Sequence, residues 1–160
     1  MNDKITTLYP LKKFENSSQH NDNLEYLRKT RNSSKQFMTR YQNEITIEQQ
    51  KLWYDNLSNN ITPYIFIVCE MGVIFYPCGY GIILIENDVA MLTGVVDEGN
   101  RGEGLGRRLF SNLISEAKKK TNKIHLEVLK TNERAINLYK SLGFIETLSK
   151  DKIVDMKLEL

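Results

Sequence analysis

The chain has 160 residues, of which 41% are hydrophobic and 26% are charged, and a formal net charge of +2. This is the length and composition of an ordinary globular domain, so an intrinsically disordered chain is excluded and a sizeable core can form. A net charge this close to zero gives no reason to expect a nucleic-acid partner. We therefore expect a single domain over residues 1–160.

The sequence carries no pattern of export or membrane insertion. Residues 1–10 mix polar and charged side chains with a few apolar ones, unlike a signal peptide. No apolar run approaches the ~18 residues of a membrane helix. Cys69 and Cys78 have neither the spacing of a zinc site nor a disulfide framework around them. We expect a soluble cytoplasmic protein with two reduced thiols, no metal, no membrane association and no nucleic-acid partner.

The first half of the chain predicts a strand, two helices and three further strands. Asp22 with Glu25 and Thr46 with Gln49 have the spacing of capping boxes, so each pair is expected to open a helix. The later runs of β-branched and aromatic residues are typical of strands buried on both faces. In chain order we expect a strand over 5–11 and a helix after residue 22 that breaks at 32–34. A second helix through 52–57 would be ended by 59–60 and Pro63. Strands over 64–69, 79–85 and 89–96 would follow, with turns at 71–72 and 86–88.

The second half of the chain predicts two amphipathic helices and three strands. Apolar residues recur at helical spacing after residue 104, in a stripe of Leu105, Leu109, Phe110, Leu113, Ile114 and Ala117. A strand over 124–129 follows, and then a helix that Thr131-Asn132 would cap and Gly143 would end. Residues 144–148 and 153–158 are typical of a closing strand pair. This order predicts a mixed α/β fold, in which a sheet carries helices on both faces.

A glycine-rich loop, Arg101-Gly102-Glu103-Gly104-Leu105-Gly106, lies between an expected strand and an expected helix. Glycines let the backbone approach a ligand closely, and the first amides of a helix have no internal partner. Together they form an anion-binding site at the positive end of the helix dipole, to which Arg101, Arg107 and Arg108 add charge. The loop is not a P-loop, and its glycine spacing and late position do not suit a dinucleotide fingerprint. By itself it leaves a plain glycine-rich turn open.

Two segments resemble the signature motifs of the GNAT superfamily of acetyltransferases. Arg101-x-x-Gly104-x-Gly106 is similar to the R/Q-x-x-G-x-G/A motif, and Val96 matches the valine that ends the preceding strand in that family. A later segment, at the usual separation in that family, resembles the second motif: Leu126-Glu127-Val128-x-x-x-Asn132-x-x-Ala135-x-x-Leu138-Tyr139-x-x-x-Gly143-Phe144. The resemblance covers about residues 89–144. Residues 97–100 depart from the family pattern, in which the segment before the loop more commonly contains proline and tyrosine.

The resemblance implies a GNAT fold and acetyl-CoA as co-substrate. That fold is a mixed sheet of about six or seven strands flanked by about four helices, in which two central parallel strands splay apart. The pantetheine arm would pair with the strand that ends at Val96, as an added strand would. The amides of 102–107 would hold the pyrophosphate, and Asn132 would bond the arm as well as cap its helix. The cofactor-binding residues so implied are Val95, Val96, Arg101, Gly102, Glu103, Gly104, Leu105, Gly106, Arg107, Asn132 and Tyr139.

Two side chains are candidates for proton transfer. The resemblance implies that Tyr139 is the general acid, because a phenol with a reference pKa of about 10 can protonate the thiolate of coenzyme A; a plain core tyrosine is the alternative. Glu127 is the candidate base. Strand alternation puts it on one face with His125 and Leu129, and a carboxylate in an apolar strand needs a role or a partner. An ion pair with a lysine or arginine is the alternative for Glu127, and His125 is the lesser candidate.

Transfer is expected to be direct, in a ternary complex. A backbone amide near Thr93 to Val95 would stabilise the oxyanion, as the family implies. Cys69 and Cys78 lie on elements remote from the expected thioester, so a cysteine nucleophile is not expected.

The acceptor side is less determined by the sequence. In the family this pocket is built from the N-terminal helices with their connecting loop and from the final hairpin, here about residues 24–57 and 148–154. The first segment contains arginines that would suit a phosphate-bearing acceptor and aromatic residues that would stack on a base or sugar. A solvated face and helix packing are the alternatives for these residues, which are Arg28, Arg31, Arg40, Phe37, Tyr41 and Trp53.

We expect the acceptor to be a primary amine of a small molecule, with a nucleotide-linked amino sugar as one candidate. Two alternatives stay open. One is a protein N-terminal acetyltransferase of the ribosomal-protein type, since Leu126-Glu127-Val128 is similar to a motif in which the glutamate of those enzymes is the base. The other is a non-catalytic acyl-CoA-binding sensor. The sequence also leaves a homodimer open.

Overall fold

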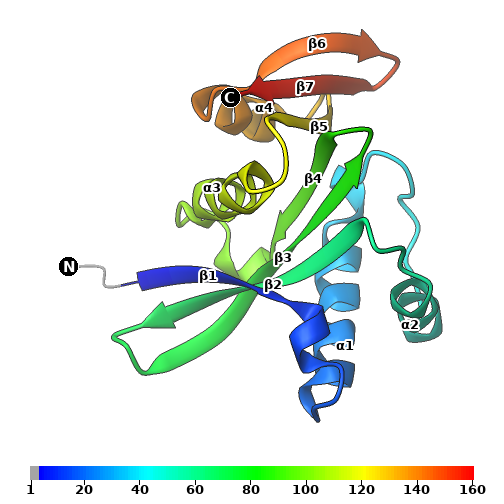
Figure 1. Ribbon diagram of the computed structural model, residues 1–160, viewed down its shortest axis with the longest axis vertical. Helices are drawn as coiled ribbons and strands as arrows, with labels where there is room; N and C mark the ends of the chain where they lie inside the picture. The colour runs from blue at the N-terminus through cyan, green and yellow to red at the C-terminus, as the bar shows by residue number, and fades with distance from the viewer. Residues whose placement is uncertain (1–3) are drawn as a thin grey trace.

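A seven-stranded mixed sheet in the order β1-β2-β3-β4-β5-β7-β6 organises the protein in a computed structural model that describes residues 4–160 (Figure 1). The expected domain also includes residues 1–3, which lie outside the described part. The strands are β1 (Lys4–Pro10), β2 (Ile61–Glu70), β3 (Ile74–Glu86), β4 (Val89–Val96), β5 (Lys123–Leu129), β6 (Ile145–Lys150) and β7 (Ile153–Glu159). The helices are α1 (Gln19–Ser33), α2 (Ile47–Asp55), α3 (Leu105–Lys118) and α4 (Glu133–Ser141), with short 3-10 turns at Leu11–Phe14, Lys35–Phe37 and Glu98–Asn100. The predicted mixed sheet with flanking helices is therefore confirmed.

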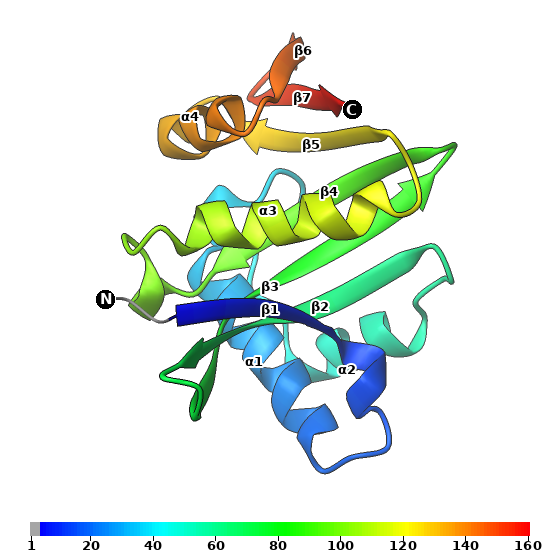
Figure 2. The same cartoon turned by 60° about the vertical axis from the view of Figure 1, so that its left-hand side comes forward.

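The central strands β4 and β5 run parallel and separate after two residue pairs. Ala90 lies opposite Ile124 and Met91 opposite His125, and the pairing ends there. β4 is paired with β3 along its whole length, and β5 is paired with β7 along its whole length. Each strand is thus held from its outer side, and Figure 2 shows the divergence that results. The splay implied by the family resemblance is confirmed.

Helices cover both faces of the sheet and enclose two hydrophobic cores. α3 and α4 pack on one face, and α1 and α2 lie over the other (Figures 1 and 2). The apolar stripe predicted for α3 is buried at every position. The smaller core joins Leu24 and Leu27 of α1 to Ile65 of β2 and Tyr80 of β3. Within residues 4–160, no helix has the length and apolar character needed to cross a membrane.

One of the two predicted helix starts is confirmed and the other is wrong. Thr46 and Gln49 form a reciprocal capping box at the start of α2, and the Gln49 amide donates to Thr46 Oγ1 at 3.1 Å. α1 begins instead at Gln19, so Asp22 lies in its first turn and not before it. An acidic residue in the first turn is stabilised by the helix dipole without capping, and here Ser17 Oγ accepts from the Gln19 amide at 3.2 Å.

The predicted end of the second helix also needs correction. α2 ends at Asp55, so Leu57 lies outside it. Pro63, which was expected to end the helix, is inside β2 opposite Ile82. β1 pairs with β2 only as far as Tyr64, so the missing N–H of Pro63 removes no hydrogen bond to β1.

Both predicted hairpin turns are confirmed by their backbone angles. Met71 and Gly72 have φ angles of 54° and 71°, and Asn87 and Asp88 have φ angles of 52° and 63°. Two successive positive φ angles are typical of type I′ turns between antiparallel strands. Two residues separate the paired Glu86 and Val89, whereas three separate the paired Glu70 and Ile74. These turns set the register of β3 against its two neighbours.

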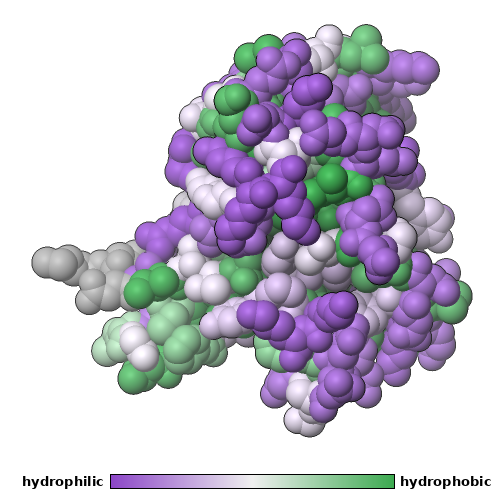
Figure 3. All heavy atoms as spheres, viewed as in Figure 1, coloured by the Kyte–Doolittle hydropathy of each residue, from purple (hydrophilic) through white to green (hydrophobic). Residues whose placement is uncertain are grey.

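The end of the β2–β3 hairpin exposes an apolar patch. Met71, Val73, Ile74 and Phe75 have exposed fractions between 50% and 75%, and they form the green area at the lower left of Figure 3. The hairpin projects here beyond the helices that cover the rest of the sheet (Figure 1).

We predict that Gly79→Ala destabilises the fold. A Cβ at Gly79 would lie 2.3 Å from the carbonyl oxygen of Val95, a backbone atom of the paired strand that no rotamer change can move. The strands would have to shift, which should lower the free energy of unfolding by about 1–3 kcal/mol, as overpacking does. Urea unfolding followed by circular dichroism measures this loss.

Gly99→Ala is the matched control. Its Cβ would have 3.7 Å to the nearest atom, Asp97 Oδ1, and its φ lies outside the left-handed range. The free energy of unfolding of this variant should stay within about 0.5 kcal/mol of the wild type. Equal unfolding midpoints for the two variants would contradict the predicted clash.

Candidate active site

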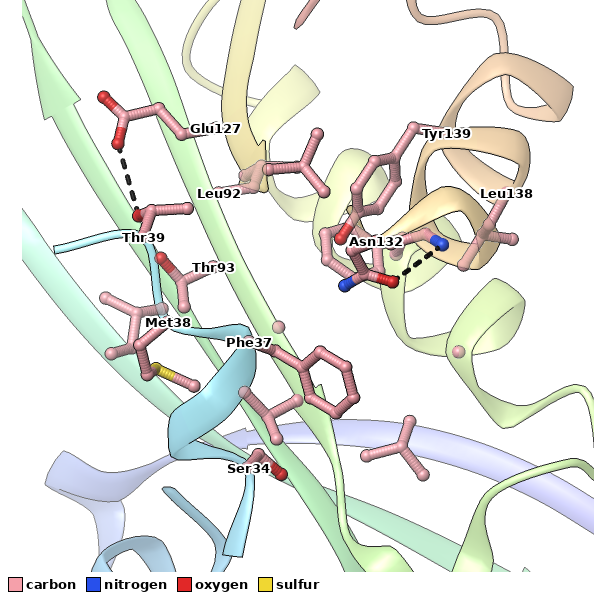
Figure 4. Close-up of a pocket in the computed structure, with 18 of the residues that line it drawn as sticks. Ser34, Phe37, Met38, Thr39, Leu92, Thr93, Glu127, Asn132, Leu138 and Tyr139 are labelled. Carbon is pink, nitrogen blue, oxygen red and sulfur yellow. Dashed lines mark hydrogen bonds between the residues drawn. The ribbon is translucent and has the colours of Figure 1, made fainter. Parts of the chain in front are cut away.

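A cleft of about 1100 Å³ opens where β4 and β5 diverge. Its walls come from the segment after α1, the strands β3 and β4, the glycine loop with the start of α3, the end of β5, and α4. Figure 4 shows Ser34, Phe37, Met38 and Thr39 on one side, Asn132, Leu138 and Tyr139 on the other, and Leu92 and Thr93 of β4 between them. Of the predicted site residues, those that line the cleft are Val95, Val96, Arg101, Gly102, Gly104, Leu105, Gly106, Arg107, Glu127, Asn132 and Tyr139.

The glycine loop presents unpaired backbone amides to the cleft. Gly102 and Gly104 have φ angles of 87° and 75°, and both have open space where a Cβ would stand. No backbone carbonyl within residues 4–160 accepts a hydrogen bond from the amides of residues 102–107, which we call the loop amides. The next amide, that of Arg108, donates to the Gly104 carbonyl at 3.4 Å. Amides at a helix N-terminus carry partial positive charge, so the loop amides fit a diphosphate.

Two arginines beside the loop line the cleft. Arg101 donates to Ser34 Oγ, and its guanidinium lies 5.4 Å from the centre of the Phe37 ring. Arg107 donates to Ser141 Oγ at 2.5 Å. Both guanidinium groups are therefore oriented by neutral partners, and their charges remain available to an anion in the cleft.

Two other charged residues of the loop face away from the cleft. Arg108, which was expected to add charge at the loop, donates to the carbonyl of Lys4 at 2.6 Å. Glu103 pairs with Lys4 Nζ at 3.3 Å, so only its backbone belongs to the loop amides.

Arg134, in the first turn of α4, lines the cleft and was missed in the sequence. The available signal was a cation two residues after Asn132.

A hydrogen-bonded anchor holds the start of the loop. Tyr26 of α1 donates to Asp97 Oδ2 at 2.6 Å, and Asn100 donates to Asp97 Oδ1 at 2.7 Å. The Asp97 amide donates to the carbonyl of Cys78 at 2.8 Å. Burial, together with the Asp97 carboxylate, raises the pKa of Tyr26, so its hydroxyl remains a donor. Asp97 and Asn100 belong to the segment that departs from the family pattern, and here they tie the loop to α1.

Tyr139 and Asn132 meet on the cleft wall that α4 forms. Tyr139 is 8% exposed, and its ring centre lies 4.8 Å from that of Phe110 and 6.0 Å from that of Phe144, both edge to face. Burial raises the pKa of the Tyr139 hydroxyl, so it keeps its proton at neutral pH. Asn132 Oδ1 accepts from the Ala135 amide at 3.3 Å, which confirms the predicted cap. Figure 4 shows the Tyr139 hydroxyl directed toward Asn132.

Glu127 of β5 lies across the diverging gap from Thr93 of β4. Each of them is two residues beyond Met91 and His125, the last residues that pair between the two strands. Glu127 Oε1 is 2.6 Å from Arg40 Nη2, and Thr39 Oγ1 donates to Glu127 Oε2 at 3.4 Å. The Glu127 side chain is 19% exposed, against 78% for Arg40. The ion pair considered as the alternative for Glu127 is therefore present, and the carboxylate still lines the cleft. His125 is not among the residues that line it.

The arginines expected to bind an acceptor phosphate are engaged elsewhere. Arg28 pairs with Glu25 at 2.5 Å and does not line the cleft. Arg31 lines it but donates to two backbone carbonyls of the loop after α1. Arg40 pairs with Glu127. Arg28 and Arg40 are thus paired with carboxylates, whereas Arg31 has its guanidinium oriented by neutral carbonyls and keeps its charge.

The predicted acceptor-side aromatic residues line the cleft, whereas the final hairpin does not. Phe37, Tyr41 and Trp53 all line the cleft, and Trp53 also packs against the smaller core, which was the alternative for it. Residues 148–154 contribute nothing to the lining. β6 and β7 pair beyond β5, on the far side of that strand from the gap, so the hairpin is too remote to reach the cleft.

Neither cysteine is placed for nucleophilic catalysis. Cys78 is fully buried, and its thiol lies 3.5 Å from the carbonyl of Phe66. Burial raises the pKa of Cys78 to about 12, so little thiolate forms at neutral pH. Cys69 is half-buried, and neither residue lines the cleft.

The fold is shared with proteins of known structure. A domain from Methanocaldococcus jannaschii matches with a TM-score of 0.81 at 19% identity over 100% of both chains. A ribosomal-protein-alanine N-acetyltransferase from Brucella melitensis matches with a TM-score of 0.70 at 21% identity, over 88% of this chain and 96% of that one. A spermidine N-acetyltransferase from Vibrio cholerae, in complex with CoA and spermine, matches with a TM-score of 0.74 at 17% identity, over 96% and 95% of the two chains. At these identities the likeness establishes the fold alone.

Comparison by sequence assigns the family. No curated protein matches the chain significantly. The model of the acetyltransferase (GNAT) family matches residues 24–144, a range that begins within α1 and includes the glycine loop and α4. The range covers most of the chain and the elements that form the cleft. The chain therefore belongs to the GNAT family of acetyltransferases.

Proposed function

We propose that the protein transfers the acetyl group of acetyl-CoA to a primary amine of a small molecule, directly and within a ternary complex. The observation that carries this proposal is the meeting of three features in one cleft: the unpaired loop amides, the open edge of β4, and the Tyr139 hydroxyl. They match the diphosphate, the pantetheine amides and the thioester of acetyl-CoA, in that order along the cleft.

The chain's own groups suffice to hold acetyl-CoA along β4. The loop amides bind the diphosphate, and Arg101 and Arg107 add charge beside it. The peptide groups of β4 that face the gap pair with the pantetheine arm as an added strand would, and Asn132 bonds the arm from α4. When bound, acetyl-CoA supplies the acetyl group as an activated thioester.

Glu127 and Tyr139 divide the proton transfers between them. Glu127 accepts a proton from the acceptor ammonium, directly or through water, so that the nitrogen lone pair can attack the acetyl carbonyl carbon. A β4 amide near Thr93 stabilises the oxygen that becomes negative. Tyr139 gives its proton to the thiolate as the C–S bond breaks, and the products are the N-acetylated amine and free coenzyme A. Arg40 has to leave Glu127 first, and its exposed position makes this a local rearrangement.

The family does not determine the acceptor. Two of the similar structures are a ribosomal-protein-alanine and a spermidine acetyltransferase, whose acceptors have little in common. A small molecule is favoured here because Thr39, whose hydroxyl donates to Glu127 Oε2 at 3.4 Å, bridges the cleft and restricts entry of a protein N-terminus even after Arg40 has left. A phosphorylated acceptor, including a nucleotide-linked amino sugar, is disfavoured because two of the three candidate arginines, Arg28 and Arg40, are paired with carboxylates.

Turnover tests the proposal. With acetyl-CoA and a panel of primary amines that includes nucleotide-linked amino sugars and peptides, the protein should release free thiol only when an amine is present. Tyr139→Phe should lower kcat about a hundredfold, as loss of a general acid does, and leave CoA affinity by calorimetry nearly unchanged. Because burial raises the pKa of Tyr139, wild-type kcat should not fall between about pH 8 and about pH 10.

Tyr64→Phe is the matched control for this experiment. Tyr64 is also 8% exposed, and burial raises the pKa of its hydroxyl, but it lies in the core and does not line the cleft. This variant should keep the wild-type kcat. Wild-type turnover by Tyr139→Phe would exclude Tyr139 as the acid, and a complete lack of turnover would favour the acyl-CoA-binding sensor.

Replacement of Gly104 should weaken CoA binding. Gly104→Val places a branched side chain at φ 75° in the middle of the loop amides, and we expect the dissociation constant of CoA by calorimetry to rise at least about tenfold. Gly72→Val is the control, because Gly72 has φ 71° and equally open surroundings but lies in the β2–β3 turn. The two variants share the backbone strain, so equal CoA affinities would refute the anion site.

Glu127→Gln should lower kcat/KM about a hundredfold at neutral pH. The loss should shrink as the pH approaches the acceptor pKa of about 10, because the amine then deprotonates without help. Arg40→Gln is the control, since it breaks the same ion pair and keeps the carboxylate. It should retain at least wild-type kcat/KM. Equal losses in the two variants, at every pH, would show that the ion pair is structural and that Glu127 is not the base.

A further inference from the structure

One open face of the sheet forms a floor at the acceptor end of the cleft. Ile61 lies opposite Leu84 and Leu84 opposite Met91; in the adjacent row, Ile82 lies opposite Thr93. Residues that pair across antiparallel strands project to the same face, so these five side chains form one surface. All five line the cleft and remain half-buried or exposed, although Ile82 also packs against the smaller core. We call this surface the acceptor floor.

A carboxylate stands at each end of the acceptor floor. Glu127 lies across the gap from Thr93, and Glu86 follows Leu84 by two residues, which puts it on the same face of β3. They are the only acidic side chains that line the cleft within residues 4–160. Ile82 and Glu86 are four residues apart, which corresponds to roughly 13 Å along a strand. Two negative groups therefore bracket a mainly apolar surface.

The two carboxylates differ in their partners. Glu127 is paired with Arg40, whereas Glu86 forms no salt bridge with any residue from 4 to 160. Arg31, the other cation at this end of the cleft, donates to backbone carbonyls. Glu86 and Arg31 therefore both line this end of the cleft without an ion pair to a residue from 4 to 160, and the Glu86 carboxylate is available to a cationic group of a ligand.

We propose that the preferred acceptor is an elongated amine with an apolar middle and a second positive charge at its far end. This inference rests on the proposed function, because the reacting nitrogen takes the end of the floor near Glu127. The methylene chain of the acceptor lies on Leu84 and Met91, and its distal ammonium pairs with Glu86. A distal phosphate or carboxylate is repelled by the same side chain.

The test compares three acceptors of one length whose distal ends differ in charge. Octamethylenediamine, octylamine and ω-aminooctanoate carry a positive, a neutral and a negative end. Wild-type kcat/KM, measured by thiol release, should fall in that order. After the statistical factor for two identical amines, the diamine should exceed octylamine about three- to fivefold, as for a solvent-exposed ion pair, and added salt should shrink this advantage. Tetramethylenediamine, which is too short to reach Glu86, should show no such advantage over butylamine.

Substitution of Glu86 connects the preference to one side chain. Glu86→Gln should remove the advantage of octamethylenediamine over octylamine, and Glu86→Lys should reverse the order in favour of ω-aminooctanoate. Asp88→Asn is the matched control, because it removes one negative charge from the adjacent turn, does not line the cleft, and has a φ of 63° that asparagine tolerates. It should leave the wild-type order intact.

The outcomes separate this inference from the proposed function. Turnover of octylamine without any preference for distal charge, or a preference that survives Glu86→Gln, would overturn the inference and leave acetyl transfer standing. A lack of turnover with every amine would overturn both.

Discussion

The interruption of the parallel β4–β5 pairing is the feature on which the rest of the site depends. β3 holds β4 and β7 holds β5 along their whole lengths, so the two strands cannot close the gap between them. The peptide groups of β4 that face the gap lack strand partners beyond Met91. Unpaired backbone groups are costly when buried, so this edge stays open to water or takes a ligand that brings amides of its own. A ligand arm with its own amides completes the ladder as a strand would.

The glycine loop adds an anion site to one end of that opening. Several side chains turn from the loop toward the rest of the protein: Arg108 and Glu103 both contact Lys4, and Asp97 at the loop's start is bonded to Tyr26. The backbone amides remain on the cleft side, flanked by Arg101 and Arg107. Left-handed φ angles at two glycines give this arrangement without steric cost, and they aim successive amides at one region. The side chains therefore hold the loop in place while its backbone binds.

Charge is distributed unevenly along the cleft. Arg101 and Arg107 line the end beside the loop, whereas the unpaired Glu86 carboxylate stands at the other end, where Arg31 is held by backbone carbonyls. Tyr139 lies between these ends, and so does the ion pair of Glu127. An anionic co-substrate and a cationic acceptor are therefore attracted to different ends of one opening, and their orientation follows from their overall charge before the reacting atoms meet.

The sequence by itself determined the elements that depend on near neighbours: the stripe of α3, the Thr46–Gln49 cap, the hairpin turns and the glycine loop. These signals act within a few residues, so a linear pattern contains them. Together with the second motif they also indicated the family and the splayed strands. Only the tertiary structure decided the partners of charged groups. Arg40 and Glu127 are 87 positions apart, and Glu86 shares a surface with Glu127 only through the registers of three strands. A charge acts over a few ångströms in space, whatever the separation of the residues along the chain. The partners of a charged side chain are therefore determined only once the strands have paired in their final register.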